Sequence, residues 1–456
     1  MRLFFFSCSF LVWSLTVNGQ GDLPRRALLG IQPQEVTVAQ SIAAGGSGAH
    51  RVLVRQVFPG TTAEQLGLES EDIISEINGE RLYNNQDLFA TLGGLNAGDP
   101  IEVQFYRQGK AQSAKGTLQG FPLPAHSSGT ITMGAVPFQE GYLRSFLHTP
   151  SGVGPFPTIY FLQGYTCGSI EFTQDTHPFN RLIQQFVDAG YAVFRVEKPG
   201  VGDCRGTLDC MEIDFPTELS AFEAAYQYLL ELPEVDRDAI TLYGHSLGGL
   251  VAPKLAAKFQ PQSVVVFGTL LYSWDDYLLE LFRFQWPLEG RDHAEVEAQV
   301  LSVKDLYYQY FHEKKAPSEL RASPEAMSVF ADMMDIRGPY MINRHYTFWQ
   351  TLNEENFVAA WKAYSGKVLA LYGEHDVAAL DSDAAQQIIS LVNHYHPGQG
   401  TFQLVPDTNH SLLLVESKKQ SYALNRTGQI GAYSIDHFNQ NYAPQILDWL
   451  GGGQKN

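Results

Sequence analysis

From residue 158 to the C-terminus, apolar strand-like runs alternate with helical runs, and this alternation constrains the fold more than any other feature of the sequence. The strand-like runs are TIYFLQG (158–164), YAVFRVE (191–197), AITLYG (239–244), SVVVFGTL (263–270), KVLALYG (367–373) and TFQLVP (401–406). Helical runs such as NRLIQQFVDAG (180–190) and LVAPKLAAKF (250–259) lie between them. A strand that is buried on both faces is apolar throughout, and parallel strands need crossover helices. The pattern therefore predicts an α/β fold, with a mainly parallel sheet and helices on both faces.

The alternation stops between about 272 and 362, where the chain is helical and rich in aromatic residues. Tyr272, Trp274 and Tyr277 open this stretch, and Trp361 lies near its end. Aromatic residues at helical spacing occur in buried cores as well as at ligand sites. An insertion here lies where a lid over the ligand end of the sheet would lie. We therefore predict a helical lid, while leaving open how many of its aromatic residues contact a ligand.

A G-x-S-x-G motif, Gly244 to Gly248, connects the strand AITLYG to the helix LVAPKLAAKF. This strand–turn–helix context is the one in which the motif exposes a nucleophilic serine on a sharp turn. The flanking glycines allow the turn, and the helix N-terminus presents N–H groups to a developing negative charge. Ser246 is therefore the predicted nucleophile; the alternative is a glycine-rich turn with an idle serine.

A nucleophilic serine needs a base, and the base needs an orienting acid. Asp376 follows the strand KVLALYG, and His410 follows the strand TFQLVP, so both lie where strand ends converge on one crevice. The order Ser246, Asp376, His410 predicts a catalytic triad. His375 is a rival base. The rival acids are Glu374, Asp381, Asp275 and Asp276.

Two backbone N–H groups are needed to stabilise the oxyanion that forms during acyl transfer. One is predicted at Leu247, the residue after the nucleophile, and the other at Tyr165, in the loop after the strand TIYFLQG. None of the spacings between the cysteines resembles a zinc site. We therefore expect no metal and no cofactor.

The region 26–118 has the pattern of a separate, small, mainly β domain. HRVLVRQV (50–57) alternates as a strand does, and DIISEING (72–79) is a strand that ends in an Asn-Gly turn. NQDLFATLGGL (85–95) has helical spacing. A segment rich in Pro, Gly and Ser follows, so residues 119–129 are the predicted linker to an α/β domain over 130–456.

ALLGI (27–31), VFPGTTAEQLGLESEDIISEING (57–79) and VQFYRQG (103–109) resemble a bacterial-type PDZ domain, with Glu71 where that family usually has Gly. The resemblance implies a groove beside Leu29, Gly30 and Ile31 whose N–H groups receive a C-terminal carboxylate. The helix around 87–92 would form the other wall. A peptide would bind there as an added strand. The alternative is a spacer or dimerisation module with an empty groove.

From Ser151 to the C-terminus the chain resembles the α/β-hydrolase superfamily, and more narrowly bacterial esterases of the EstD kind. The resemblance rests on YAVFRVEKPGVGDCRG (191–206), with Pro199 where Arg is common, and on the stretch 214–257 around the serine motif. It implies the same triad, Ser246, Asp376 and His410.

The first twenty residues, MRLFFFSCSFLVWSLTVNGQ, have the pattern of a secretory signal peptide. Arg2 precedes a short apolar run, and small residues before Gln20 predict cleavage after residue 19. The alternative is a buried N-terminal strand. With 31 Lys and Arg against 49 Asp and Glu, the net charge is −18. Such a charge argues against binding nucleic acid or anionic lipid. We expect a secreted or periplasmic protein without a membrane span.

Cleavage would leave Cys167, Cys204 and Cys210. In an oxidising compartment we expect one disulfide and one free thiol. Cys204 and Cys210 flank the short segment CRGTLDC and are the expected pair. Pairing of Cys167 with either of them stays open.

These features together predict an exported serine hydrolase that cleaves small carboxylic esters through an acyl-enzyme. Its PDZ domain would recruit a partner's C-terminus or gate the site. A serine peptidase of the same fold is the main alternative, because a peptide-binding domain precedes the triad. Acyl transfer to an acceptor other than water, and a PDZ binding module with an inactive hydrolase domain, are the remaining possibilities.

Overall fold

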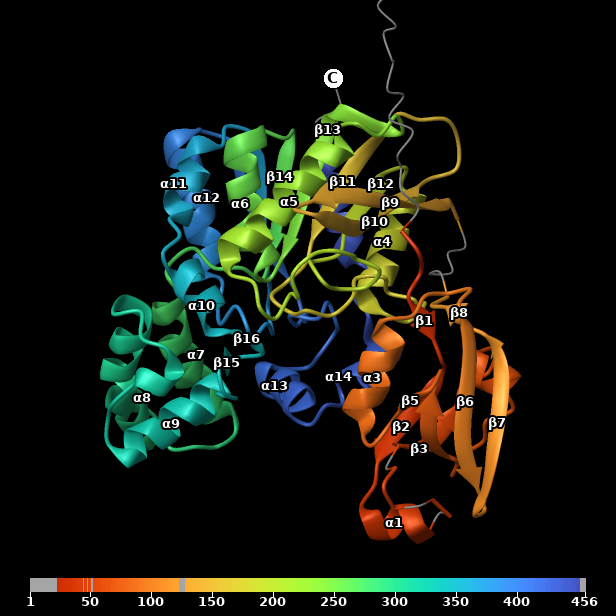
Figure 1. The fold of residues 1–456 in the computed structure, drawn as a ribbon. Helices are drawn as coiled ribbons and strands as arrows, with labels where there is room; N and C mark the ends of the chain where they lie inside the picture. Colours follow the sequence, from red (N-terminus) through yellow and green to blue (C-terminus); the bar gives the residue numbers. More distant parts are fainter. Residues whose placement is uncertain (1–22, 44, 47, 51, 123–127, 452–456) are drawn as a thin grey trace, which may run out of the picture.

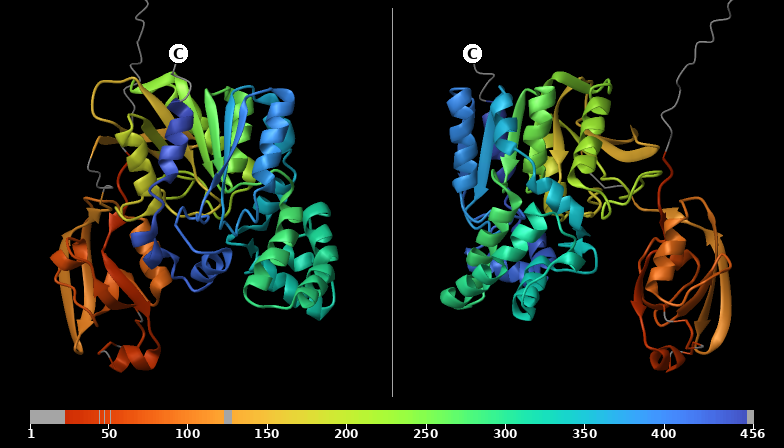
Figure 2. Two further views of the ribbon diagram at one scale, coloured as in Figure 1. Left: turned by 180° about the vertical axis from the view of Figure 1, so that it is seen from behind. Right: turned by 60° about the vertical axis from the view of Figure 1, so that its left-hand side comes forward.

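The computed structural model describes residues 23–43, 45–46, 48–50, 52–122 and 128–451. The predicted signal peptide, residues 1–19, lies outside these residues. Figures 1 and 2 show two parts, a small β unit (residues 26–120) and a larger sheet unit (residues 128–451), with a layer of helices at one side of the latter. Within the described residues, no helix has the length and apolar character needed to cross a bilayer.

The β unit is built around a twisted antiparallel sheet. Its strands run in the order β2 (Ile31–Glu35), β3 (Val52–Val57), β4 (Ile73–Ile77), β6 (Pro100–Arg107) and β7 (Lys110–Thr117), and β5 (Glu80–Arg81) pairs with β4. The accompanying elements are α1 (Val38–Ala43), α2 (Thr62–Gln65), α3 (Asn85–Gly93), β1 (Ala27–Leu28) and β8 (Gln119–Gly120). Alternate apolar residues of the strands, such as Val52, Val54 and Val103, form its core. Strand β2 lies at the edge of this sheet, and α3 packs beside it.

The sheet unit is built on one large sheet of eight strands, of which six are parallel. Their order is β18 (Gly400–Val405), β17 (Lys367–Gly373), β14 (Ser263–Phe267), β13 (Val235–His245), β11 (Phe156–Leu162), β12 (Ala192–Val196), β10 (Gly141–Thr149) and β9 (Thr130–Phe138). Strand β10 pairs antiparallel with both β12 and β9. The prediction of a mainly parallel sheet is therefore confirmed, and the β9–β10 hairpin is an addition that the sequence analysis did not include.

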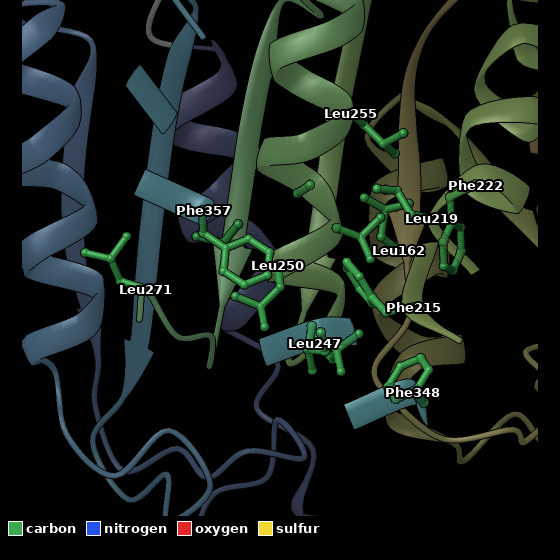
Figure 3. Close-up of a cluster of buried hydrophobic side chains, with 14 of the residues drawn as sticks. Leu162, Phe215, Leu219, Phe222, Leu247, Leu250, Leu255, Leu271, Phe348 and Phe357 are labelled. Atoms are coloured by element: carbon green, nitrogen blue, oxygen red, sulfur yellow. The ribbon is translucent and has the colours of Figure 1, made fainter. Parts of the chain in front are cut away.

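Helices cover both faces of the large sheet, as predicted. The helices are α4 (Pro178–Asp188), α5 (Phe215–Leu229), α6 (Gly248–Phe259), α12 (Asp383–Tyr395) and α15 (Tyr442–Gly451). On one face, buried residues of α5 and α6 such as Leu219 and Leu250 pack with Leu162 of β11 (Figure 3). On the other face, α4 and α15 pack Phe186 and Ile446 into a second apolar cluster.

The insertion between β14 and β17 is mostly helical. It consists of α7 (Trp274–Leu288), α8 (His293–Tyr307), a π-helical turn (Tyr308–His312), a 3₁₀ turn (Pro317–Glu319), α9 (Pro324–Met334), β15 (Tyr340–Met341), β16 (Arg344–His345), α10 (Tyr346–Asn353) and α11 (Phe357–Ala363). Helix α11 packs against α6, and α10 against α5, whereas α7–α9 form the separate layer in Figure 1. Most of the large aromatic side chains are core; Trp349 and Trp361 are fully buried. Two further helices, α13 (Lys418–Arg426) and α14 (Ile430–His437), follow β18.

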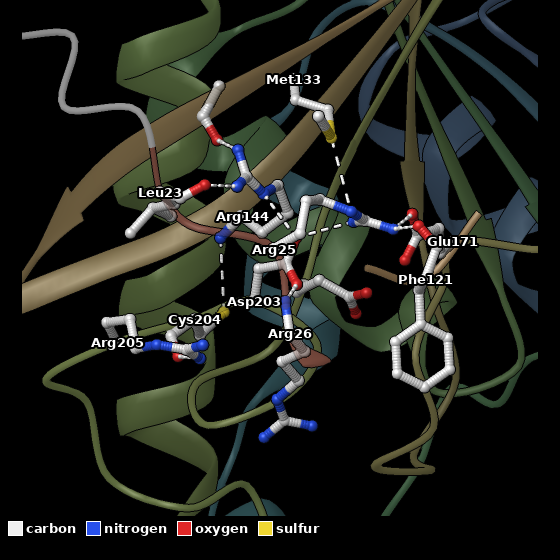
Figure 4. Close-up of polar contacts among 12 residues, drawn as sticks. Leu23, Arg25, Arg26, Phe121, Met133, Arg144, Glu171, Asp203, Cys204 and Arg205 are labelled. Atoms are coloured by element: carbon white, nitrogen blue, oxygen red, sulfur yellow. Dashed lines mark hydrogen bonds and ion pairs between the residues drawn. The ribbon is translucent and has the colours of Figure 1, made fainter. Parts of the chain in front are cut away.

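Ion pairs just before the β unit, partly buried at Arg25 and buried at Arg144, join the two units (Figure 4). The Arg25 guanidinium lies 2.7 Å from Asp203 and 2.5 Å from Glu171, both in the sheet unit. The Arg26 N–H donates to the other oxygen of Asp203 at 2.7 Å, and Arg144 of β10 lies 3.1 Å from the same carboxylate. Arginine and carboxylate charges are thus matched where the units meet.

The expected Cys204–Cys210 disulfide is wrong, because the bond joins Cys167 to Cys210. Cys204 is a buried free thiol: its Sγ accepts a hydrogen bond from the Arg144 N–H and faces the Lys198 carbonyl at 3.4 Å. Its side chain therefore belongs to the core beside β10. Closeness in sequence misled the prediction, because the loop after β11 folds back and brings Cys167 to Cys210.

Removing this disulfide should destabilise the sheet unit, because the bond closes a segment of 43 residues. We expect Cys167→Ser/Cys210→Ser to lower the free energy of unfolding by about 2–4 kcal/mol in urea denaturation. The control is Cys204→Ala in the same assay. A non-reduced tryptic digest checks the pairing, since cleavage after Arg205 places Cys204 and Cys210 on different peptides. A link between peptides 145–181 and 206–237 is expected, and a link to 196–205 would contradict it.

Candidate active site

Ser246 lies on a sharp turn between β13 and α6. Its φ is +57°, a left-handed conformation that a serine adopts only when its surroundings hold it there. The Ser246 N–H donates to the Phe267 carbonyl of β14 at 2.9 Å. A Cβ on Gly248 would lie 2.1 Å from the Leu162 carbonyl oxygen, so the motif needs glycine there for the helix to approach the sheet.

Asp376 and His410 meet beside this turn. Asp376 follows β17, His410 follows β18, and the His410 Nδ1 lies 2.7 Å from the Asp376 Oδ2. The other oxygen of Asp376 accepts hydrogen bonds from the N–H groups of Ala378 and Ala379. Burial by itself would raise the pKa of Asp376, but the His410 charge and these hydrogen bonds outweigh it, so the pKa lies below its ordinary value. Asp376 is therefore ionised and can orient the imidazole.

The rival base and the rival acids that the sequence left open make other contacts. His375 faces Asp407 at 3.8 Å, and Asp275 lies 2.8 Å from His312 on the insertion. The other rival acids bind backbone or hydroxyl groups: Glu374 accepts from the Asp407 N–H, Asp381 from the Asp383 N–H and Asp276 from the Ser273 hydroxyl. Ser246 and His410, by contrast, line the same cavities.

His245, inside the serine motif, is a contact that the sequence analysis missed. Its Nε2 lies 2.8 Å from the His410 carbonyl oxygen, and its ring lies 4.7 Å from the His410 ring. Burial lowers the pKa of His245 to about 3, so the ring is neutral and its Nε2–H can donate to that carbonyl. It thereby fixes the backbone of the predicted base.

The predicted oxyanion groups, the N–H of Leu247 and of Tyr165, flank the serine. Leu247 is buried at the N-terminus of α6. The loop with Tyr165 passes close by, since a Cβ on Gly164 would lie 3.3 Å from the Ser246 Cβ and 3.6 Å from its Oγ. Within the described part of the chain, neither N–H donates to another residue. Both are free to bind a negative oxygen.

A cavity of about 370 Å³ opens from Ser246 and His410. Most of its walls are apolar or aromatic, including Ile170, Phe172 and Phe179. His177 also lines it; burial lowers its pKa to about 4, so it is uncharged. The sequence analysis missed these lining residues because Ile170, Phe172 and His177 lie in a loop without periodicity, and Phe179 lies in the first turn of α4.

The insertion also reaches the serine. A narrow space beside Ser246 is lined by Trp274 and Tyr277 of α7 and by Leu270. The Tyr277 hydroxyl donates to the Ala378 carbonyl, next to the acid Asp376. The insertion thus lies beside Ser246, and only a few of its aromatic residues line the site.

In the β unit, Leu29, Gly30 and Ile31 lie at the start of edge strand β2. The carbonyls of Leu29 and Gly30 accept hydrogen bonds from the N–H groups of Ala63 and Phe58. One edge of β2 pairs with β3, and the other is the outer edge of the sheet beside α3. An open strand edge next to a helix can add a peptide as a further strand.

One group among the described residues has metal-binding side chains close together, namely Glu374, His375 and Asp407. Glu374 and Asp407 are exposed and His375 is partly buried, and Glu374 already accepts a hydrogen bond from the Asp407 N–H. Exposed acidic groups of this kind are common on surfaces without a metal, so we assign it no metal.

The family comparisons identify the class of protein as a hydrolase. The family model described as alpha/beta hydrolase family matches residues 159–420, more than half of the chain, and the PDZ domain model matches residues 27–118. The chain therefore belongs to the alpha/beta hydrolase family, and an N-terminal PDZ domain precedes its hydrolase domain.

Curated relatives match only parts of the chain. A probable periplasmic serine endoprotease DegP-like protein from Marinomonas sp. is 33% identical over 97 residues, which is 21% of each chain. Acyl-coenzyme A thioesterase 1 from Rattus norvegicus is 31% identical over 137 residues, 30% of this chain and 29% of the relative. The chain thus spans less than a third of these relatives. Among solved structures, Est1E from Butyrivibrio proteoclasticus with bound ferulic acid has a TM-score of 0.42 and 15% identity, covering 65% of this chain and 99% of that one.

Proposed function

We propose that the protein is an exported serine hydrolase that cleaves carboxylic esters. The supporting observation is the Asp376–His410 pair beside Ser246 on a strained strand–helix turn, at the mouth of a mainly apolar cavity. The proposed organisation is a signal peptide over 1–19, a PDZ domain over 26–118, a linker over 119–129 and a hydrolase domain over 130–456 with a lid over about 272–362.

In the proposed reaction the Ser246 Oγ attacks the ester carbonyl carbon while the His410 Nε2 takes the hydroxyl proton. Asp376 stabilises the imidazolium, and the N–H groups of Leu247 and Tyr165 bind the oxyanion. The C–O bond to the alcohol then breaks, and His410 returns the proton to the leaving oxygen. Water hydrolyses the acyl-enzyme by the same steps, with His410 as base and then as acid.

The cavity favours a small ester over a peptide. Its volume and its apolar walls suit an acyl chain or an aromatic group, which bury well without hydrogen-bond partners. The family membership and the thioesterase relatives are consistent with acyl hydrolysis. We expect no cofactor in this chemistry, because the serine, the base and the oxyanion groups supply every step.

The PDZ domain favours a second candidate, a peptidase whose substrate would be captured by its C-terminus at Leu29, Gly30 and Ile31. The open edge of β2 supports peptide binding in that groove. In the ester hydrolase, the same groove would recruit a partner protein or gate the site through the contacts of Arg25 with Asp203 and Glu171.

Labelling with a fluorophosphonate tests the proposal. The purified protein without residues 1–19 should take one label, on the tryptic peptide that contains Ser246, and Ser246→Ala should take none. Parallel panels of short acyl esters and of peptides with free C-termini then separate the two candidates. Turnover of esters with none of peptides supports the esterase; the reverse supports the peptidase. Folded protein that takes no label, with or without PDZ-binding peptides, would contradict both.

A further inference from the structure

Three charged side chains are completely buried next to the loop that carries Tyr165. Lys198 follows β12, Glu218 lies on α5, and Arg344 lies on β16 of the insertion. The Lys198 Nζ is 2.9 Å from one Glu218 oxygen, and the Arg344 Nη1 is 2.8 Å from the other. Placing three charges in the interior is costly, so the fold keeps them only where they are paired. A net positive charge remains, because two cations share one carboxylate.

Both cations are directed at the peptide groups of this loop. The Lys198 Nζ donates to the Gly164 carbonyl oxygen at 2.6 Å, and the Arg344 Nη1 donates to the Tyr165 carbonyl oxygen at 2.9 Å. The Gly164 carbonyl and the Tyr165 N–H belong to one peptide group, whose C=O and N–H point in opposite directions in the trans form. With its carbonyl turned to Lys198, the peptide directs its N–H the other way.

We propose that Lys198 is a positioning residue for catalysis, whose ammonium group fixes and polarises the Gly164–Tyr165 peptide so that its N–H binds the oxyanion more strongly. This inference rests on the proposed function. A cation on the carbonyl draws electron density from the peptide nitrogen, and hydrogen bonds in a chain strengthen one another in a low-dielectric interior. The hydrogen bond from the cation is itself stronger than a neutral one.

The proton on Lys198 sets a pH dependence. Burial lowers the pKa of Lys198 to about 8; the nearby Glu218 raises it, and Arg344 lowers it further. On its own segment, Glu197 is bound to Ser169 and the Ile170 N–H. Because the cation is the effective form, its contribution is present below the pKa and is lost as the pH rises through about 8.

Lys198→Met tests the proposal, since it removes the charge and keeps a similar length, while Glu218 retains Arg344 as its partner. We expect kcat on a short acyl ester to fall roughly 10- to 100-fold with KM changed by less than about twofold, because the loss weakens one oxyanion donor without deleting it. Inhibition by an alkyl boronic acid should weaken by a similar factor, because its serine adduct places a negative oxygen at the same N–H. The matched control is Lys254→Met, which breaks the ion pair between Lys254 of α6 and Glu355 after α10 and should behave as wild type.

The pH profile separates this role from a structural one. Wild-type kcat should fall above about pH 8, and Lys198→Met should lose that fall. A variant with wild-type kcat and boronate inhibition, or with the same alkaline fall, would overturn the proposal. If the variant does not fold, a wild-type kcat that stays level from about pH 7 to 10 overturns it instead. A wild type that takes no label on Ser246 and has no esterase activity refutes the proposed function, and this inference falls with it.

Discussion

Replacing Ser246 by alanine should lower kcat for ester hydrolysis by about 10⁶-fold, and His410→Ala should cost about as much. The double variant should be no worse than either single one. The reason is that the Ser246 hydroxyl and the His410 imidazole act in the same proton transfer. Once one of them is removed, the other no longer contributes to catalysis. Steady-state kinetics on a short acyl ester measures the three losses.

The control for this series is Ser390→Ala, an exposed serine on α12 whose hydroxyl binds the Gln386 carbonyl. It should keep wild-type kcat. Losses that multiply in the double variant would show that Ser246 and His410 contribute independently, which contradicts the triad. Circular dichroism of each variant confirms that the fold is retained.

Local constraints explain how the sequence indicated which residues gather around Ser246. The turn at Ser246 needs glycine on both sides, and the strands before Asp376 and His410 are apolar throughout, as strands buried on both faces must be. Ser246, Asp376 and His410 all lie at the carboxyl ends of parallel strands. The contact between Asp376 and His410 could be predicted only from the order of their strands along the chain.

Long-range contacts between polar residues could not be predicted in the same way. Strand β10 contains the buried Arg144 and His148, so it lacks the continuous apolar pattern that identified the other strands. Arg144 is tolerated there because Asp203, far along the chain, neutralises it. The Cys167–Cys210 disulfide and the Lys198–Glu218 pair likewise depend on where loops return, which no local periodicity encodes.

Replacing Gly268 should also lower kcat strongly, because Gly268 lies directly against Asp376 and His410. It follows β14 with φ +62°, and a Cβ there would lie 2.7 Å from the Asp376 Oδ2 and 2.8 Å from the His410 Nδ1. Real Cβ atoms essentially never come that close, so Gly268→Ala must push the carboxylate and the imidazole apart. We expect kcat to fall by about 10³- to 10⁴-fold, the scale of losing the orienting carboxylate in a triad.

The matched control is Gly428→Ala, at the end of α13, because Gly428 has φ +68° and a Cβ there would meet no atom within 4 Å. Both substitutions force an L-residue into the left-handed region, at about 1–2 kcal/mol of stability. Only Gly268→Ala should lose activity, since only its Cβ enters the Asp376–His410 contact. The low-field proton resonance of the His410 Nδ1–H should vanish with it. Wild-type kcat in Gly268→Ala would refute the role of Asp376 as the orienting acid. An equal loss in Gly428→Ala would assign the effect to the left-handed backbone and not to the Asp376–His410 contact.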